Sequence, residues 1–313
     1  MLIHLGYVSI SKTLDISPSK TITYTEFKKN KDFKKLNNII IENLTNLEKI
    51  IDYNIKNNIH FYRLTSKLIP LASLNEIEFN YIEKYKKYYE RIGNKINKHN
   101  IRVDTHPDQF CVLNSTKKEV IENSINILKY HYNILKALNI KNKVIILHIG
   151  SSVFGKDNSI KRFINNFNKL PNYLKECIVI ENDDKIYNIK DCLNLCEKLN
   201  IPMVLDYHHH ICNHDNLNID EYLKKIFNTW NKTPKIHFSS PKNKTKKEFR
   251  SHHDYINIDD FINFLEKLKS LNINTNLDIM LECKAKDEAL FKLVRQLKYH
   301  NYQFINDTTI NLK

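Results

Sequence analysis

The stretch VIILHIG at residues 144–150 is a short apolar run, rich in β-branched residues, that carries a histidine near its end. Five further runs have the same form, with a histidine or a carboxylate at or just beyond the apolar segment. They are VDTHPDQF (103–110), VIEND (179–183), MVLDYHHH (203–210), PKIHFSS (234–240) and DIMLEC (278–283). Polar residues at the ends of parallel strands gather on one rim of a barrel. The repeated form therefore predicts a barrel with a polar site on that rim.

Apolar, strand-like runs alternate with longer segments of helical period along the whole chain. We expect strands near 2–8, 59–64, 101–105, 143–149, 177–181, 202–206, 234–238 and 277–282. We expect helices near 36–57, 76–99, 117–138, 158–172, 188–199, 219–229, 258–270 and 286–300. Eight β-then-α units predict an α/β fold, a single (β/α)8 TIM-type barrel. An open doubly wound sheet is the alternative. Because no Pro/Gly/Ser-rich tract divides the chain, we expect one domain over residues 1–313.

The chain is strongly basic, with 49 Lys and Arg against 35 Asp and Glu and a formal net charge of +14. Such a charge can attract a polyanion such as nucleic acid. Lysines that merely solvate the surface are the alternative, because Lys, Asn and Ile are frequent throughout. The charge alone does not decide between the two.

Cysteine usage and the N-terminus bear on where the protein works. The six cysteines form no CxxC pair, so we expect no disulfides. The first residues, MLIHLGYVSI, have neither a charged leader nor a long apolar core, so neither secretion nor membrane insertion is indicated. We therefore expect a cytoplasmic protein in a reducing compartment.

Histidines and carboxylates end six consecutive predicted strands, and two more histidines follow in nearby loops. The full set is His106, His148, Glu181, Asp206, His209, His237, His252 and Glu282. A single histidine at a strand end is usually a hydrogen-bonded structural residue, whereas eight such groups on one rim indicate metal binding. Imidazole and carboxylate suit Zn²⁺, Mn²⁺ or Fe²⁺, and the lack of cysteine argues against a closed structural zinc site. Eight ligands imply two or three ions, an arrangement suited to phosphodiester hydrolysis.

Two cationic residues fall on the same predicted strands. Lys235 faces the same side as His237, because side chains alternate along a strand. Either its ammonium pairs with a carboxylate, or its amine is neutral and takes up carbon dioxide as a carbamate, which is an anionic ligand. Arg63 ends the second strand and either binds phosphate or pairs with a carboxylate. The segment KNKTKKEFR (242–250) is either a solvated loop or a phosphate contact.

Read in order, these residues resemble the UV damage endonuclease family, whose barrel is similar to that of endonuclease IV. The resemblance spans nearly the whole chain. It is carried by LGY (5–7), YRLTSKLIPLAS (62–73), THPDQF (105–110), ILHIGS (146–151), IENDD (180–184), VLDYHHH (204–210), PKIHFSS (234–240), RSHHDYI (250–256) and DIMLECKAKDEAL (278–290).

The resemblance implies a trinuclear site of the manganese type, with Zn²⁺, Co²⁺ or Fe²⁺ as other candidates. It assigns metal binding to the eight residues above and a carboxylated lysine to Lys235. We expect Glu181, His237 and Lys235 to carry catalysis. The implied activity is a DNA repair endonuclease that nicks UV-damaged double-stranded DNA immediately 5′ of the photoproduct, leaving a 3′-hydroxyl and a 5′-phosphate. We expect a monomer with no obligate protein partner.

The HPDQF stretch departs from the family motif HPGQY. In the family the Gln-Tyr pair probes the damaged dinucleotide, which implies the same role for Gln109 and Phe110 here. Phe110 can still wedge into a base stack, with a core aromatic as the alternative. Asp108 adds a negative charge near the DNA. Tyr7 matches a family tyrosine near the lesion, with an ordinary barrel tyrosine as the alternative.

Three other functions remain open from the sequence. The nearest is an abasic-site endonuclease similar to endonuclease IV, which shares the barrel and the trinuclear chemistry. A metal-dependent sugar isomerase on the same kind of barrel is another, although it would need no basic rim. The last is a basic DNA-binding barrel with structural metals and no catalysis.

Overall fold

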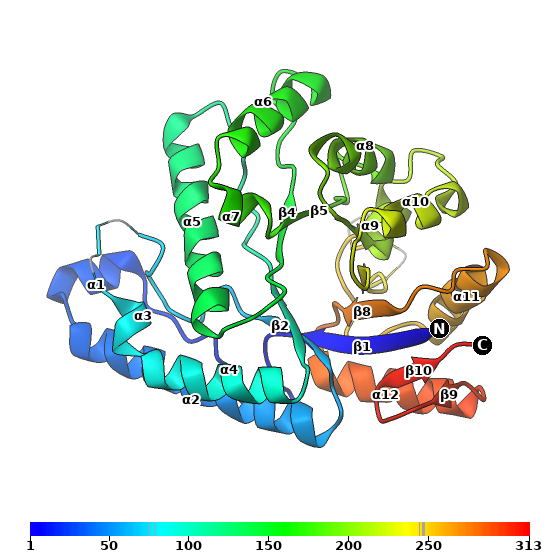
Figure 1. Ribbon diagram of the computed structural model, residues 1–313, viewed down its shortest axis with the longest axis horizontal. Coiled ribbons are helices and arrows are strands. Elements are labelled where there is room, and N and C mark those ends of the chain that lie inside the picture. Colours follow the sequence, from blue (N-terminus) through cyan, green and yellow to red (C-terminus); the bar gives the residue numbers. More distant parts are fainter. Residues whose placement is uncertain (75, 78, 244, 246–247) are drawn as a thin grey trace.

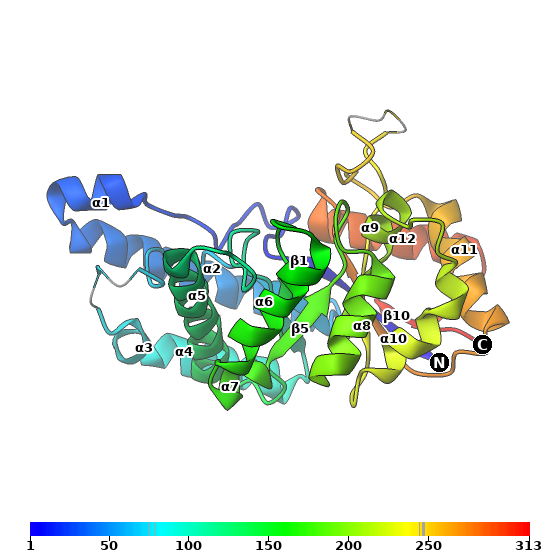
Figure 2. The same cartoon turned by 90° about the horizontal axis from the view of Figure 1, so that it is seen from above.

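Eight parallel strands close into a barrel in the computed structural model, which describes residues 1–313 except 75, 78, 244, 246 and 247 (Figures 1 and 2). The strands are β1 (Leu2–Val8), β2 (Phe61–Leu64), β3 (Arg102–Thr105), β4 (Ile145–His148), β5 (Ile178–Glu181), β6 (Met203–Asp206), β7 (Lys235–Phe238) and β8 (Leu277–Leu281). Each overlaps a predicted strand. Because β1 pairs with both β2 and β8, the barrel is closed, and the prediction of a TIM-type barrel is confirmed over the open sheet.

The seam of the barrel runs along β1, which changes partner along its length. Its residues 3–7 pair with β8, and Gly6 lies opposite Phe61 at the start of the pairing with β2. A Cβ atom at Gly6 would lie 2.3 Å from the carbonyl oxygen of Phe61, so only glycine fits there. The seam therefore depends on a residue without a side chain.

The C-terminal segment adds a short antiparallel extension that the sequence did not predict. It consists of β9 (Gln303–Phe304) and β10 (Thr309–Asn311), and β10 pairs with the first residues of β1. The N-terminal amine donates to the carbonyl oxygen of Leu312 at 2.7 Å. The two termini consequently lie side by side at the same end of the molecule (Figures 1 and 2).

Helices surround the barrel, with α2, α4 and α5 on one flank and α8, α10 and α11 on the other (Figures 1 and 2). The helices are α1 (Tyr24–Asn30), α2 (Phe33–Lys56), α3 (Tyr81–Lys84), α4 (Lys86–Lys98), α5 (Lys118–Ala137), α6 (Lys156–Asn168), α7 (Asn172–Lys175), α8 (Ile189–Leu199), α9 (Tyr207–Cys212), the 3₁₀ turn η1 (Ile219–Glu221), α10 (Leu223–Asn228), α11 (Ile258–Ser270) and α12 (Lys286–Tyr299). Within the described residues, no helix is both long and apolar enough to cross a bilayer.

Several predicted helices differ from those in the structure. The helix expected over 76–99 is two helices, because Asn80 caps the start of α3 and the backbone breaks at Tyr85; residue 78 of that prediction lies outside the described residues. The helices expected over 158–172 and 219–229 are also divided. Two short helices, α1 and α9, were not expected. Short helices carry too few turns to show a clear period in sequence.

The interior of the barrel has an apolar part and a charged part. Val144, Ile146, Val179 and Val204 form a buried cluster on β4, β5 and β6 and the residue just before β4. Charged side chains from β2, β3 and β7 fill the other part, and they are fully or almost fully buried. A larger apolar core packs the helices against the outside of the barrel. All six cysteines are free thiols.

Candidate metal centre

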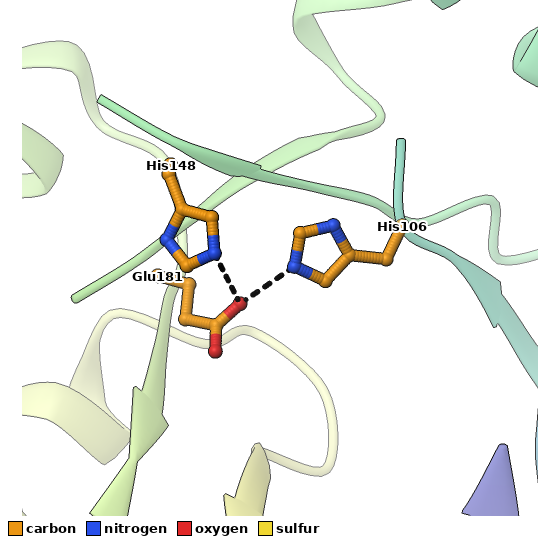
Figure 3. Close-up of side chains that lie close together, drawn as sticks. All are labelled: His106, His148 and Glu181. Carbon is orange, nitrogen blue, oxygen red and sulfur yellow. Dashed lines mark hydrogen bonds and ion pairs between the residues drawn. The ribbon is translucent and has the colours of Figure 1, made fainter. Parts of the chain in front are cut away.

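The carboxylate of Glu181, at the end of β5, lies at the centre of a ring of histidines. Its Oε2 atom is 2.9 Å from Nε2 of His106 and 3.6 Å from Nε2 of His148 (Figure 3). Its Oε1 atom is 2.8 Å from Nδ1 of His237 and 3.5 Å from Nδ1 of His209. Because the carboxyl ends of the strands lie on one rim of the closed barrel, histidines from four different strands or following loops meet at this one carboxylate.

Three overlapping groups in this ring have ligand atoms close enough together to share a metal ion. In each group the ligand atoms all lie within 4.8 Å of one another. The groups are His106–His148–Glu181, Glu181–Asp206–His209 and Asp206–His237–Glu282. Glu181 and Asp206 each belong to two groups, as bridging carboxylates would.

Local structure after β6 orients Asp206. Asp206 is the N-cap of α9, and its Oδ1 atom accepts a hydrogen bond from the backbone N–H of His209 at 2.8 Å. The side chain of Asn182 is hydrogen-bonded to both the N–H and the carbonyl oxygen of Asp206, at 2.9 and 3.0 Å. The other oxygen of the Asp206 carboxylate, Oδ2, is buried and has no hydrogen-bond partner in the described part of the chain. A buried carboxylate oxygen without a donor is costly unless a cation binds it.

The charge balance of the site also fits bound cations. Four carboxylates, those of Asp104, Glu181, Asp206 and Glu282, are fully or largely excluded from solvent. Within the described residues, Arg63 and Lys235 provide the arginine and lysine contacts to them. Buried negative charge in such excess needs compensation. Imidazole nitrogens and carboxylate oxygens are suitable ligands for Mn²⁺, Zn²⁺, Fe²⁺ or Co²⁺, so the residues present fit a divalent metal.

The pKa values of the ring show how the charges are balanced without metal. Burial alone would lower the pKa of His209, but Asp206 and Glu181 outweigh it and raise the pKa to about 9. Burial opposes ionisation of Glu181, yet His237 and His148 hold its pKa well below the ordinary value. The pKa of His237 is raised against burial, chiefly by Glu181. A proton on His209 thus supplies part of the positive charge that the carboxylates of the ring require, whereas burial lowers the pKa of His148.

Beneath the ring lies a buried ion network centred on Asp104. Its Oδ1 atom is 3.1 Å from Nε of Arg63, and its Oδ2 atom is 3.1 Å from Nζ of Lys235. The Arg63 guanidinium also contacts the carboxylate of Glu282 and Nε2 of His237. Burial lowers the pKa of Lys235, and the attraction of Asp104 opposes this. Of the alternatives left open by the sequence, both cations pair with a carboxylate in this structure.

His252 lies at the edge of the ring. Its Nδ1 atom is 2.8 Å from the backbone carbonyl oxygen of Glu282 and 4.0 Å from the Glu282 carboxylate. An isolated bridge between Pro241 and His252 holds this loop next to the end of β7. Neither His252 nor Lys235 belongs to the three groups, so their assignment as ligands stays a prediction.

A cavity of about 880 Å³ opens beside the ring. His148 and His209 line it together with Gln109 and Phe110 from the loop after β3. The Phe110 side chain is 71% exposed, so it lies outside the core. Asp108, where the family motif has glycine, accepts a hydrogen bond from the Phe110 N–H at 3.0 Å. Its carboxylate thus helps to fold the turn that carries Phe110.

Other predicted contact residues lie apart from the ring. Tyr7 is fully buried, and its hydroxyl donates to the side chain of Asn54 on α2 at 2.8 Å, which places it on the outer face of the barrel. In the segment 242–250, residues 244, 246 and 247 lie outside the described residues. Arg250 is the last residue of that segment, and its Nε atom lies 3.7 Å from Oδ2 of Asp184.

Two residues of the site were missed in the sequence. Asp104 precedes His106 by two positions, so strand alternation already placed it on the same face. Asn182 follows Glu181 directly in the run VIEND, and its backbone carbonyl oxygen is 3.0 Å from Nδ1 of His209. The position of Asp104 could therefore have been predicted from its spacing to His106. The role of Asn182 depends on the geometry of β6, for which the sequence offers no signal.

Comparisons of the sequence and of the structure with known proteins identify the same family. A model of the family described as UV-endonuclease UvdE matches residues 3–313. A UV DNA damage endonuclease of Bacillus mycoides (strain KBAB4) is 42% identical over 319 residues, which cover 99% of each chain. The crystal structure of SacUVDE is similar with a TM-score of 0.87 and 34% identity, over 96% of this chain and 99% of that one. Endonuclease IV from Thermus thermophilus, at 11% identity and a TM-score of 0.54 over 81% of this chain and 95% of that one, shares the fold.

Proposed function

The chain belongs to the UV-endonuclease UvdE family and is therefore a DNA repair endonuclease, and we propose that it is metal-dependent and nicks DNA immediately 5′ of UV photoproducts. The proposed products are a 3′-hydroxyl and a 5′-phosphate. We propose further that residues 1–313 form a single endonuclease domain that acts as a monomer on UV-damaged double-stranded DNA, without an obligate protein partner.

The observation that carries metal dependence is the buried Oδ2 atom of Asp206, which accepts no hydrogen bond from the described residues and has Nδ1 of His209 3.6 Å away. It lies in a site with more buried carboxylates than lysine and arginine partners. Three overlapping ligand groups support a proposal of three ions, with Mn²⁺ as the first candidate. The proposed ligands are His106, His148, Glu181, Asp206, His209, Lys235, His237, His252 and Glu282. When bound, such ions would neutralise the phosphate and lower the pKa of water to near neutrality.

The protein side chains would hold the reacting groups in place. The Glu181 carboxylate hydrogen-bonds to His106 and His237, which orients both rings. The rings of His148 and His209 lie 3.6 and 3.5 Å from it. Nδ1 of His209 lies 3.0 Å from the backbone carbonyl oxygen of Asn182, and donation of its proton there would leave Nε2 as the nitrogen available to a metal ion. We propose that Glu181 and His237, at the centre of the ring, are catalytic because they would touch the reacting phosphate through the bound ions.

Lys235 has two possible forms in this proposal. The ammonium form is the one paired with Asp104 at 3.1 Å. Burial, which lowers the pKa of Lys235, favours the neutral amine that carbon dioxide requires. We propose that a carboxylated Lys235 is the catalytic and metal-binding form, with Arg63 nearby to balance its charge.

Lesion recognition is proposed for the loop after β3. Phe110 is exposed beside the cavity and can enter a base stack, while Gln109 next to it can form hydrogen bonds with bases. Arg63 is 5% exposed and engaged by carboxylates, so a phosphate contact would require it to leave them. Tyr7 stays a prediction only, because its fully buried ring would reach DNA only after the packing around β1 opened.

Incision of a duplex that carries one defined photoproduct tests this function. We expect a nick immediately 5′ of the photoproduct when Mn²⁺ is present, and none after chelation. A matched duplex with one abasic site separates this activity from that of an abasic-site endonuclease. Incision that persists in chelator would contradict metal dependence, and faster incision of the abasic duplex would contradict the proposed substrate.

A further inference from the structure

Phe154 stands out on the loop that joins β4 to α6 (Figure 1). Its side chain is 76% exposed, and its neighbour Val153 is 46% exposed. The backbone of Phe154 has a φ of 64°, in the left-handed region that bulky residues rarely adopt. Displaying a large apolar side chain in an unfavourable backbone conformation costs stability, so such a residue is a candidate for function.

Hydrogen bonds brace the loop at the position of Phe154. Nδ2 of Asn158 donates to the carbonyl oxygen of Phe154 at 2.9 Å. The carbonyl oxygen of Val153 accepts from Oγ of Ser159 at 3.0 Å and from Nη2 of Arg162 at 2.6 Å. The first two turns of α6 thus fix the loop from one side. These hydrogen bonds fix the backbone from which the exposed ring of Phe154 extends.

The same loop is tied to the one that carries Phe110. Nδ2 of Asn114, in the loop after β3, donates to the carbonyl oxygen of Ser151 at 2.6 Å. Arg162 closes the connection by donating from Nε to the carbonyl oxygen of Asn114 at 2.9 Å. Ser151 also lines the cavity beside the metal ring, as Phe110 does. Two exposed phenylalanines therefore project from two hydrogen-bonded loops on the rim that carries the proposed active site.

We propose that Phe154 is a second DNA-contacting aromatic, which stacks on an unpaired base beside the lesion while Phe110 enters the base stack. This inference rests on the proposed function. Aromatic side chains stack on any base, and a base displaced by a wedge exposes such a face. DNA is favoured as the occupant because the Phe154 loop is hydrogen-bonded to the loop that carries Phe110, on the rim of the proposed active site. The test must distinguish this DNA contact from self-association, in which a second copy of the chain docks on Phe154.

The test compares Phe154→Ala and Phe154→Trp with Tyr299→Ala. Tyr299 is 85% exposed at the end of α12, which returns to the opposite end of the barrel, so it controls for loss of an exposed aromatic. Single-turnover nicking by the Mn²⁺-loaded proteins gives a half-saturating concentration and a maximal rate on a duplex with one photoproduct. A 2-aminopurine opposite the lesion reports base unstacking.

We expect Phe154→Ala to raise the half-saturating concentration by about 5- to 100-fold and to reduce the 2-aminopurine change. Phe154→Trp should keep the half-saturating concentration and the 2-aminopurine change near the wild-type values, and Tyr299→Ala should alter neither quantity. The thermal midpoints of all three variants should match that of the wild-type protein. Wild-type behaviour of Phe154→Ala overturns the inference while leaving the proposed function intact. Failure of the wild-type protein to nick the duplex overturns the proposed function instead. Self-association that disappears in Phe154→Ala, with unchanged nicking, also overturns the inference.

Discussion

The ammonium of Lys235 lies 3.1 Å from the carboxylate of Asp104 inside the barrel, and both side chains are shielded from solvent. This pair stabilises the ammonium form, whereas a metal ligand at Lys235 requires a carbamate. The two forms predict different responses to bicarbonate and to Lys235→Arg. Arginine keeps a positive charge beside Asp104 but cannot form the carbamate.

We expect Lys235→Arg to fold, as followed by circular dichroism, and to lose nicking by more than about 100-fold, because the anionic ligand is missing. Nicking by the wild-type protein should rise when bicarbonate is added to degassed buffer. Native mass spectrometry should show the added mass of one carbon dioxide, which Lys235→Arg lacks. A wild-type protein without that mass, together with an active Lys235→Arg, would mean that the ion pair is the working form.

Arg63 offers a second test, between a structural role and a DNA contact. Because its guanidinium is held by Asp104 and Glu282, we expect Arg63→Met to lower the free energy of unfolding of the metal-free protein by about 3–5 kcal/mol. The salt dependence of DNA binding should keep its slope. A slope reduced by about one charge would instead identify a phosphate contact. Urea denaturation and binding at several salt concentrations give both quantities.

Glu181→Gln removes the charge at the centre of the ring while keeping its shape. We expect nicking to fall by more than about 100-fold, because His106 and His237 lose their hydrogen-bonded anionic partner and the proposed metal site loses a charged ligand. Glu197→Gln, on the exposed face of α8, is the matched control and should have wild-type activity. Near-normal nicking by Glu181→Gln would remove Glu181 from the catalytic machinery.

The barrel could be predicted because buried parallel strands are nearly continuous apolar runs, and VIILHIG shows this at β4. The extension formed by β9 and β10 could not, because strands of two or three residues give no clear pattern. The helix α9 was hidden for a similar reason, although the tract of three histidines lies on it.

The ring could be predicted from position alone, since strand ends converge wherever a parallel barrel closes. The partner of Lys235 could not be predicted in this way, because Asp104 lies two residues before His106, deeper in the barrel than the residues at the strand ends. For Tyr7, the family resemblance and the alternation of side chains along β1 point in different directions. A resemblance placed it near the lesion, while alternation along β1 turns its ring outward, toward α2.

Phe110 tests the proposed contact with the damaged base pairs. We expect Phe110→Ala to weaken binding to a photoproduct duplex by about 5- to 100-fold, because one stacking contact is lost. Phe110→Tyr restores the family's residue and should bind at least as well as the wild-type protein. The ring is 71% exposed, so neither change should lower the thermal midpoint. A destabilised Phe110→Ala with normal binding would instead mark the ring as part of the fold.

The raised pKa of His209 predicts how metal binding depends on pH. In the metal-free protein its pKa is about 9, against an ordinary value of 6.5, because Asp206 and Glu181 outweigh the effect of burial. The protonated form therefore contributes stability that is complete below about pH 6.5 and is lost as the pH rises through about 9. A metal ion bound by His209 must displace that proton, so affinity should rise by up to about tenfold per pH unit across this range.

Calorimetric titration with Mn²⁺ in two buffers of different ionisation enthalpy measures the protons released. We expect release at pH 7.5 from the wild-type protein and less release from His209→Ala, which has no imidazole to deprotonate. The thermal midpoint of the chelated protein should fall between about pH 6.5 and about pH 9, and Mn²⁺ should restore it most at the upper end. Equal proton release from His209→Ala and the wild-type protein would show that His209 does not bind the metal.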